Sequence, residues 1–229
     1  MMTALALTGS PLWYASRAGG TLTLILLTAT VLLGVVSGGR AAPRRIGRFE
    51  IGLLHRNLSL LTLAFLVVHV VTAVLDPFVH LGWAVSVVPF GAPYRPLWLG
   101  LGTAALDLLL AVLITSALRH RLGVRRWKAV HRLAYAAWPL ALFHGAGTGT
   151  DTRLPLQLWL YAACLASVVA AVWWRLLKAG PGRIAGRLVA AVAATAVPVV
   201  LTAFLAAGPL QPGWAQRAAT AALLPGGGR

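Results

Sequence analysis

Long apolar stretches alternate with short polar segments along the whole chain. The stretches cover about 13–37, 53–75, 96–118, 127–147, 156–178 and 186–207, and clusters of Gly, Pro and Arg separate them. Each is long enough for an α-helix to cross a membrane, which takes about 20 apolar residues. The pattern therefore predicts an all-α integral membrane bundle of six transmembrane helices within residues 1–207. Residues 208–229 are rich in Pro and Gly, which predicts a loosely ordered tail.

Composition supports lipid as the solvent of this chain. Of its 229 residues, 59% are hydrophobic and 10% are charged, with a mean hydropathy of +0.82, whereas a soluble domain carries about 25% charged residues. The net charge of +16 is a feature of nucleic-acid-binding proteins. Here, however, the basic residues lie in short loops between apolar stretches, as topology signals do. The single cysteine, Cys164, excludes an internal disulfide and a thiolate metal cluster.

Basic residues mark one side of the predicted bundle. They gather in or beside the loops that follow the first, third and fifth predicted helices, as Arg40, Arg44, Arg45, Arg48, Arg119, Arg121, Arg125, Arg126, Lys128, Arg175, Lys178, Arg183 and Arg187. The alternate loops hold only Arg95 and Arg153. The positive-inside rule therefore places the three basic loops in the cytoplasm and both chain termini outside it. The second and fourth predicted helices then both start at the cytoplasmic face and run parallel.

Four histidines lie within these two parallel helices. His55 and His69 are 14 residues apart and His131 and His144 are 13 apart, so each pair spans about 20 Å of helix. Their depths match, His55 with His131 near the cytoplasmic face and His69 with His144 near the outer face. Neutral imidazole is an axial ligand of haem iron, and an ionisable residue within a membrane indicates function. The pattern favours two b-type haems, with interhelical hydrogen bonds or a single haem as alternatives.

The helical phase of the second pair is less regular than that of the first. At about 100° per residue, His69 lies about 40° from His55 around the helix, but His144 lies about 140° from His131. Pro139 lies between the latter two and can kink or rewind a helix. We therefore expect Pro139 to absorb the difference.

These histidines and their surroundings resemble the ferric reductase-like transmembrane domain, which occurs in ferric reductases, NADPH oxidases and the haem-binding membrane subunit of the bacterial methionine-sulfoxide reductase system. The resemblance is carried by WYASRAGGTLTL, LHRNLSLLTLAFLVVHVVTAVLDPF and ITSALRHRLGVRRWKAVHRLAYAAWPLALFHGAGTGTD, and it extends over about residues 13–178. The spacings of 14 and 13 match the two-haem pattern of the family. The resemblance implies that His55 and His131 bind an inner haem, and His69 and His144 an outer haem, in a bacterial plasma membrane.

One feature of the larger family members has no counterpart in this sequence. In ferric reductases and NADPH oxidases the last core helix leads into a cytoplasmic flavin and nicotinamide domain, but the sequence holds no G-x-G-x-x-G unit. The expected electron donor is therefore membrane quinol, a separate flavoprotein, or a flavin bound at the cytoplasmic face. The expected acceptor is an extracytoplasmic reductase, ferric iron or oxygen. In this respect the chain resembles the methionine-sulfoxide reductase subunit.

Several basic side chains are candidates to bind the anionic haem propionates. Arg56 and Arg132 directly follow the inner histidines, and membrane anchoring is their alternative role. Arg17, at the outer mouth of the first predicted helix, is a candidate at the outer haem, as are Arg95 and Arg153.

The acidic residues have two interpretations each. Asp107 lies near the middle of the third predicted helix, where an acid is expensive. It is a candidate proton relay for quinol oxidation, or a neutral acid that bonds a neighbouring helix. Asp76 and Asp151 lie at the outer ends of the two histidine-bearing helices. They indicate helix termination, with docking or proton supply beside the outer haem as the alternative.

Three further residues are not expected to bind a cofactor. His80 and His120 fall in predicted loops, where we expect them to be solvated. Trp138 lies deep in the fourth predicted helix, where core packing is the expected role and packing on a porphyrin the alternative.

The sequence as a whole predicts a di-haem b-type membrane cytochrome that transfers electrons from a cytoplasmic flavoprotein or quinol to an extracytoplasmic acceptor. Whether the chain is an oxidoreductase by itself stays open. The alternative from another class is a helical transporter or assembly protein whose histidines bind a metal ion or only form hydrogen bonds.

Overall fold

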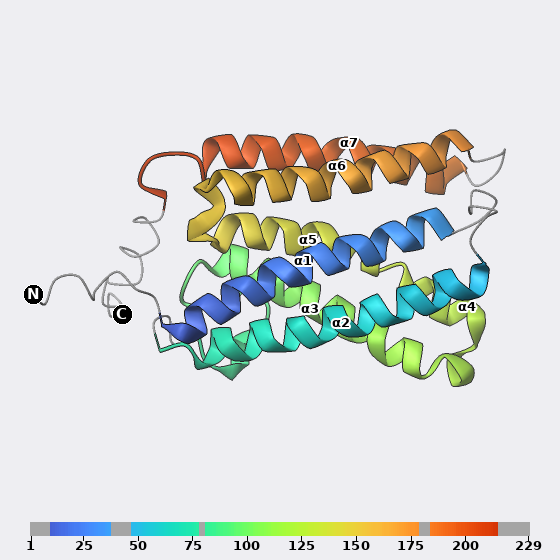
Figure 1. The fold of residues 1–229 in the computed structure, drawn as a ribbon, viewed down its shortest axis with the longest axis horizontal. Helices are drawn as coiled ribbons and strands as arrows, with labels where there is room; N and C mark the ends of the chain where they lie inside the picture. The colour runs from blue at the N-terminus through green and yellow to red at the C-terminus, as the bar shows by residue number, and fades with distance from the viewer. Residues whose placement is uncertain (1–9, 38–46, 78–80, 179–183, 215–229) are drawn as a thin grey trace, which may run out of the picture.

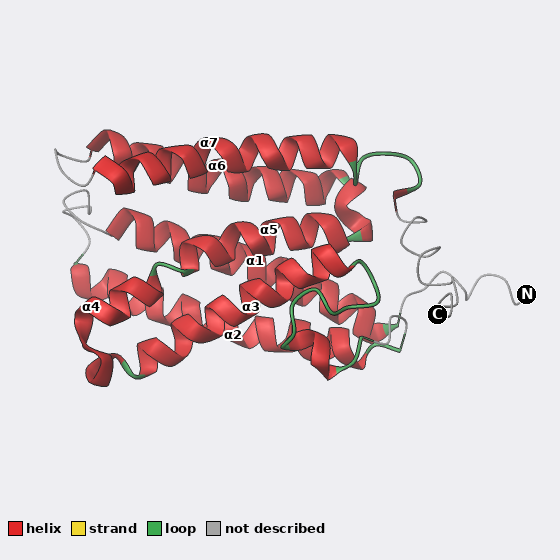
Figure 2. Ribbon diagram, turned by 180° about the vertical axis from the view of Figure 1, so that it is seen from behind, coloured by secondary structure: helices red, strands yellow, loops and turns green. Residues whose placement is uncertain are grey.

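The computed structural model describes residues 10–37, 47–77, 81–178 and 184–214, and these residues are helical with short connections (Figures 1 and 2). The helices are α1 (Pro11–Ser37), α2 (Arg48–Leu75), η3 (Trp83–Ser86), α3 (Pro96–Ala117), α4 (Arg119–His131), α5 (Ala134–Thr148), η4 (Thr150–Arg153), α6 (Pro155–Lys178) and α7 (Ile184–Ala207). The described residues contain no strand, which confirms the all-α class. His80, several basic loop residues and the tail beyond residue 214 lie outside the described residues.

The long helices lie side by side and alternate in direction (Figure 1). α1 packs against α2, α5 and α6, α3 packs against α5, and α7 packs on the outside of α6. The start of α1 and the end of α7 lie at one end of the bundle, and α4 lies at the opposite end, which we call the α4 end (Figure 1). α2 and α5 therefore run in the same direction, as the sequence predicts.

Five helices of the described chain are long and apolar enough to cross a membrane: α1, α2 from Phe49, α3, α6 and α7. The fourth transmembrane helix predicted over residues 127–147 is not observed as a single helix, because the structure divides this segment between α4 and α5. α5 alone has 15 residues, about 22 Å of helix, which is shorter than the roughly 30 Å hydrocarbon core.

The break between α4 and α5 has a local cause. The N–H of Leu133 donates to the carbonyl of Val130 at 2.8 Å, and the N–H of Ala136 donates to that of Leu133 at 2.9 Å. These bonds connect residues three apart, which is the tighter 3₁₀ geometry. Earlier in α4, Gly123 has a φ of 74° and bends the helix, a conformation that glycine tolerates.

The core lies between α1, α5, α6 and α7. Its buried residues are Leu24, Leu27, Val31 and Val35 of α1, Trp138, Leu142 and Ala146 of α5, Tyr161, Cys164 and Val168 of α6, and Leu201 of α7. Trp138 is 4% exposed, and its indole Nε1 donates to Thr28 Oγ1 at 2.9 Å. Its packing role in the core is therefore observed directly.

Polar contacts fix the helix ends. Ser10 caps α1 by accepting the N–H of Trp13 at 3.0 Å, and its hydroxyl donates to the buried Asp76 carboxylate at 3.2 Å. Asp76 directly follows α2 with extended backbone, so it terminates that helix as predicted and also connects it to α1. At the α4 end, Arg175 of α6 donates to the last-turn carbonyl of Val35 at 2.8 Å, which satisfies a free helix end.

We predict that Trp138→Phe destabilises the bundle by about 1–3 kcal/mol, because it removes a buried hydrogen bond and part of the packed indole. The measurement is the midpoint of thermal unfolding in detergent. Trp159→Phe is the matched control, since Trp159 is 75% exposed on the surface of α6. An equal midpoint for the two variants would contradict this assignment of Trp138.

Candidate functional site

The four histidines meet as two pairs at two levels of the bundle. The ring centroids of His55 and His131 are 6.1 Å apart with an interplanar angle of 61°. Those of His69 and His144 are also 6.1 Å apart, at 74°. α2 supplies the first member of each pair, the last residue of α4 supplies His131, and α5 supplies His144. The structure therefore brings together the residues that matched in depth along the sequence.

The two partner elements achieve this facing in different ways. α2 is one continuous helix, so 14 residues suffice to return His69 near the face of His55. Between His131 and His144, the N–H groups of Leu133, Tyr135 and Ala136 each donate to the carbonyl three residues earlier. This 3₁₀ geometry turns the chain by about 120° per residue where an α-helix turns it by about 100°, which reduces the mismatch. α5 continues through Pro139. The adjustment expected at Pro139 therefore lies at Arg132–Leu133.

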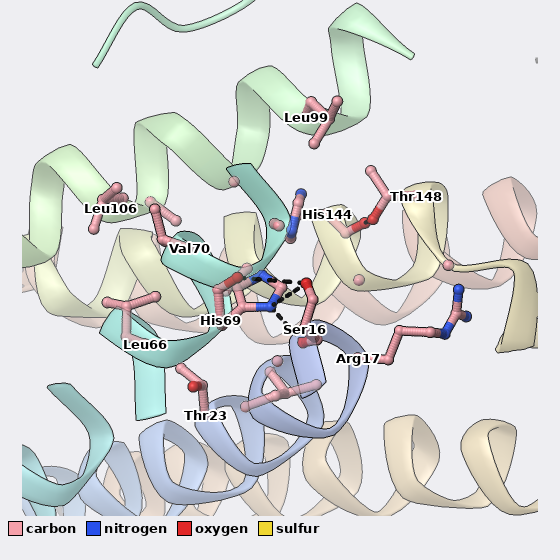
Figure 3. Close-up of a pocket in the computed structure, with 18 of the residues that line it drawn as sticks. Ser16, Arg17, Thr23, Leu66, His69, Val70, Leu99, Leu106, His144 and Thr148 are labelled. Atoms are coloured by element: carbon pink, nitrogen blue, oxygen red, sulfur yellow. Dashed lines mark hydrogen bonds between the residues drawn. The ribbon is translucent and has the colours of Figure 1, made fainter. Parts of the chain in front are cut away.

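The Nδ1 atoms of the His69–His144 pair bond to helix carbonyls. His69 Nδ1 lies 2.7 Å from the backbone oxygen of Ser16 in α1, and His144 Nδ1 lies 2.9 Å from that of Trp98 in α3. A carbonyl oxygen only accepts, so Nδ1 carries the hydrogen in both rings. In a neutral imidazole this leaves the Nε2 lone pair free to bind a metal. Figure 3 shows the His69 ring beside Ser16, with His144 near the same cavity.

A glycine follows each of these carbonyls by four residues. A Cβ built on Gly20 would lie 2.9 Å from His69 Nδ1, and one on Gly102 would lie 2.4 Å from His144 Nδ1. Both distances are too short for any side chain. The rings lie there because a helix carbonyl points toward the residue four positions later, and each ring bonds to such a carbonyl. Glycine at that residue is what admits the imidazole. Sequence reasoning missed these glycines, although the pattern of histidine pairs plus glycines in the packing helices was available.

The His55–His131 pair is held more loosely. The Nδ1 atoms of both rings are buried without a hydrogen bond of normal length among the described residues. The backbone of Thr30 lies beside His55, and Gly34, four residues later, would place a Cβ at 3.8 Å from its Cε1, which is ordinary contact. His131 stacks instead on Trp127, with centroids 5.1 Å apart and planes 32° apart.

A cavity of about 300 Å³ surrounds the His69–His144 pair, within the size range of small-molecule sites. Leu66 and Val70 of α2 and Leu99 and Leu106 of α3 line its apolar part (Figure 3). Its polar part is lined by Ser16, Arg17, Asp76, Tyr94, Asp151, Thr152, Gln157 and Tyr161. The cavity thus combines an apolar body, two free imidazole nitrogens and a polar rim.

Of the arginine candidates, Arg17 lies in the cavity wall. Its guanidinium pairs with Asp151 and lies 4.4 Å from the centroid of the Trp13 ring. Arg95 is buried outside the cavity lining, where it donates to the carbonyls of Gly147 and Trp214. Arg95 therefore caps the end of α5.

The remaining candidates lie away from that cavity. Arg56, Arg132 and Arg153 are exposed, and Asp107 is half-buried in the middle of α3 without lining the cavity. His120 is exposed on α4, which agrees with its expected solvation. Asp76 and Asp151 both line the cavity, although the sequence favoured helix termination for them.

The donor set limits what each pair can bind. Among the described residues, no three or more His, Cys, Asp or Glu side chains gather closely enough to hold a metal ion. Each histidine pair therefore offers two protein ligands. A metal–imidazole bond is about 2.0–2.1 Å long and the centroid lies about 1.1 Å beyond the nitrogen, so two imidazoles on opposite sides of one metal place their centroids about 6.2–6.4 Å apart. The observed 6.1 Å separation fits this arrangement.

Comparison with known proteins agrees with this geometry. The family model of the ferric reductase like transmembrane component matches residues 19–142, a range that contains His55, His69 and His131 and ends two residues before His144. The chain is also 31% identical over 183 residues, 77% of its own length and 78% of the relative's, to the protein-methionine-sulfoxide reductase heme-binding subunit MsrQ of Ralstonia nicotianae. No solved structure matches significantly. This chain is a multi-pass membrane protein that belongs to the ferric reductase-like transmembrane component family.

Proposed function

We propose that this protein is a di-haem b-type cytochrome that carries electrons across the bacterial plasma membrane. The observation that supports this most strongly is the facing of two imidazole pairs at two levels, each with centroids 6.1 Å apart. Two protein ligands per metal leave four positions of a six-coordinate iron open, which is the number that a porphyrin fills. When bound, haem supplies the one-electron redox step.

The chain's own residues hold and orient the cofactors. His55 with His131, and His69 with His144, would hold the two haems, and the carbonyls of Ser16 and Trp98 fix the tautomer of the second pair. Leu66 and Leu106 supply apolar wall to the cavity. Arg17 supplies a cation at its polar rim for the propionates, and Arg56 and Arg132 are the corresponding candidates near the other pair. Asp107 stays a candidate proton relay.

The charge pattern supports a membrane orientation, and the proposed direction of electron transfer rests on that orientation. With the basic α4 end in the cytoplasm, the His55–His131 pair lies on the donor side and the His69–His144 pair on the acceptor side. The donor is a cytoplasmic flavoprotein, a bound flavin or quinol. The acceptor is an extracytoplasmic reductase or ferric iron. The similar MsrQ protein is named as the heme-binding subunit of a methionine-sulfoxide reductase, and we propose such a reductase as the partner here.

The first test is haem content. We expect the purified protein to bind two haems per chain, with a b-type band in the reduced-minus-oxidised absorption spectrum. His69→Ala should lose one haem and keep the other, because each pair has its own ligands. The measurement is the pyridine haemochrome ratio of haem to protein. His120→Ala is the control, since His120 is exposed and belongs to neither pair. A chain that binds no haem with all four histidines intact would contradict the cytochrome proposal and favour a transporter or assembly protein.

The second test uses a matched pair of glycines. Gly102→Ala should reduce the haem content by about half, because its Cβ would lie 2.4 Å from His144 Nδ1 and displace the ring. Gly34→Ala should keep both haems, because its Cβ would lie 3.7 Å from the Tyr135 hydroxyl and 3.8 Å from His55 Cε1. The haem-to-protein ratio and the elution volume on gel filtration are measured together. Equal haem content in two well-folded variants would contradict the assigned role of Gly102.

A further inference from the structure

We infer that α4 is the docking surface for the electron donor, and that the donor is a redox protein with an acidic face. This inference rests on the proposed function, because it takes the His55–His131 pair as the first haem site that electrons reach. It assigns a partner chemistry and a contact residue, Trp127.

The surface of α4 is cationic. Its exposed basic side chains are Arg119, Arg121, Arg125, Arg126 and Lys128, and Arg132 follows directly. The sequence holds no acidic residue between Asp107 and Asp151, and no ion pair is formed on α4 among the described residues. α4 forms one end of the bundle (Figure 1). The positive electrostatic field of these side chains accelerates the association of an acidic protein and orients it.

A stack of three side chains connects this surface to the histidine pair. The guanidinium carbon of Arg119 lies 5.5 Å from the centroid of the Trp127 ring, and Trp127 stacks on His131 at 5.1 Å. The indole Nε1 donates to Ser116 Oγ at 3.2 Å, which fixes the ring. Trp127 is half-buried. A partner that contacts its exposed edge is therefore one aromatic ring away from a proposed iron ligand.

Membrane topology alone does not account for this stack. The same end of the bundle carries a second cation–tryptophan contact, with Lys178 Nζ 5.8 Å from the Trp174 ring. The positive-inside rule explains both cations equally well. Among the described ring contacts, however, Trp127 stacks on a histidine and Trp174 does not. Anionic lipid would also be attracted to the cations of α4, but lipid gains nothing from an aromatic connection to His131. We therefore assign the surface to a protein.

The redox step is a one-electron transfer. A reduced flavin in the docked partner loses one electron and releases the matching proton to water, and the iron held by His55 and His131 gains that electron. The partner's flavin hydroquinone would become the semiquinone, and a haem held by His55 and His131 would accept the one electron.

The test uses the full haem-loaded chain in nanodiscs of neutral phosphatidylcholine. The probe is reduced flavodoxin, a small acidic flavoprotein, and stopped-flow absorbance of the haem band gives the second-order rate constant. We expect Arg125→Gln with Arg126→Gln to lower this constant about tenfold at low salt, and the wild-type constant to fall as salt rises. Trp127→Leu should lower it to a similar extent, and Trp127→Phe should restore part of the rate. Dithionite should reduce all variants equally.

The matched controls are Lys178→Gln and Trp174→Leu, which should leave the rate constant unchanged. Equal rates for Trp127→Leu and the wild type, or no dependence on salt, would overturn the docking surface. An effect that occurs only in discs with anionic phosphatidylglycerol would overturn it in favour of lipid. The haem band recorded before mixing distinguishes failure of the proposed function from failure of this inference. Without a band, both fail. A normal band with unchanged rates contradicts the docking surface alone.

Discussion

The close facing of two imidazoles across the bundle, at two separate levels, is the constraint on which the rest of this structure depends. An α-helix fixes both its rise and its rotation per residue, so two levels on one helix must be met by two levels on a parallel partner. α2 meets this condition as a single helix, with its histidines 14 residues apart. Its partner meets it by a 3₁₀ turn between α4 and α5. The break between α4 and α5 therefore lies where the two histidines are brought to face α2.

The same constraint also determines residues of α1 and α3, because backbone carbonyls of these helices bond to the histidine rings. An N–H that is buried without an acceptor destabilises a protein by several kcal/mol. The carbonyls of Ser16 and Trp98 accept the Nδ1–H of His69 and His144, and Gly20 and Gly102, four residues later, leave room for the rings. In α1 the glycines beside the two histidine levels, Gly20 and Gly34, are again 14 residues apart. The spacing of the two glycines in α1 therefore equals the spacing of the two histidines in α2, against which α1 packs antiparallel.

Much of the fold was predictable from hydrophobic patterning, and the reasons for the exceptions are physical. Apolar length predicted the five spanning helices, because lipid demands continuous apolar helix. The sequence placed the irregularity at Pro139 and did not predict the break after His131, because Arg132 and Leu133 are neither Gly nor Pro and carry no helix-breaking signal. Pro139 is a breaker by propensity, yet α5 continues through it. Depth matching brought the correct histidines together, since it depends on rise alone.

The side chains around the pairs were less predictable, because their roles depend on where neighbouring elements end. Arg95 was a candidate to bind the propionates of the outer haem, and in the structure it caps α5 through the carbonyl of Gly147. Asp151 was read as a helix end and instead pairs with Arg17 in the cavity wall. The chemistry of the two ends differs as a result. At the His69–His144 end, Arg17 pairs with the chain's own Asp151, and Arg95 donates to backbone carbonyls. The basic side chains of α4 are exposed and form no ion pair among the described residues. Because their charge is not neutralised within the chain, these side chains are suited to bind an acidic partner.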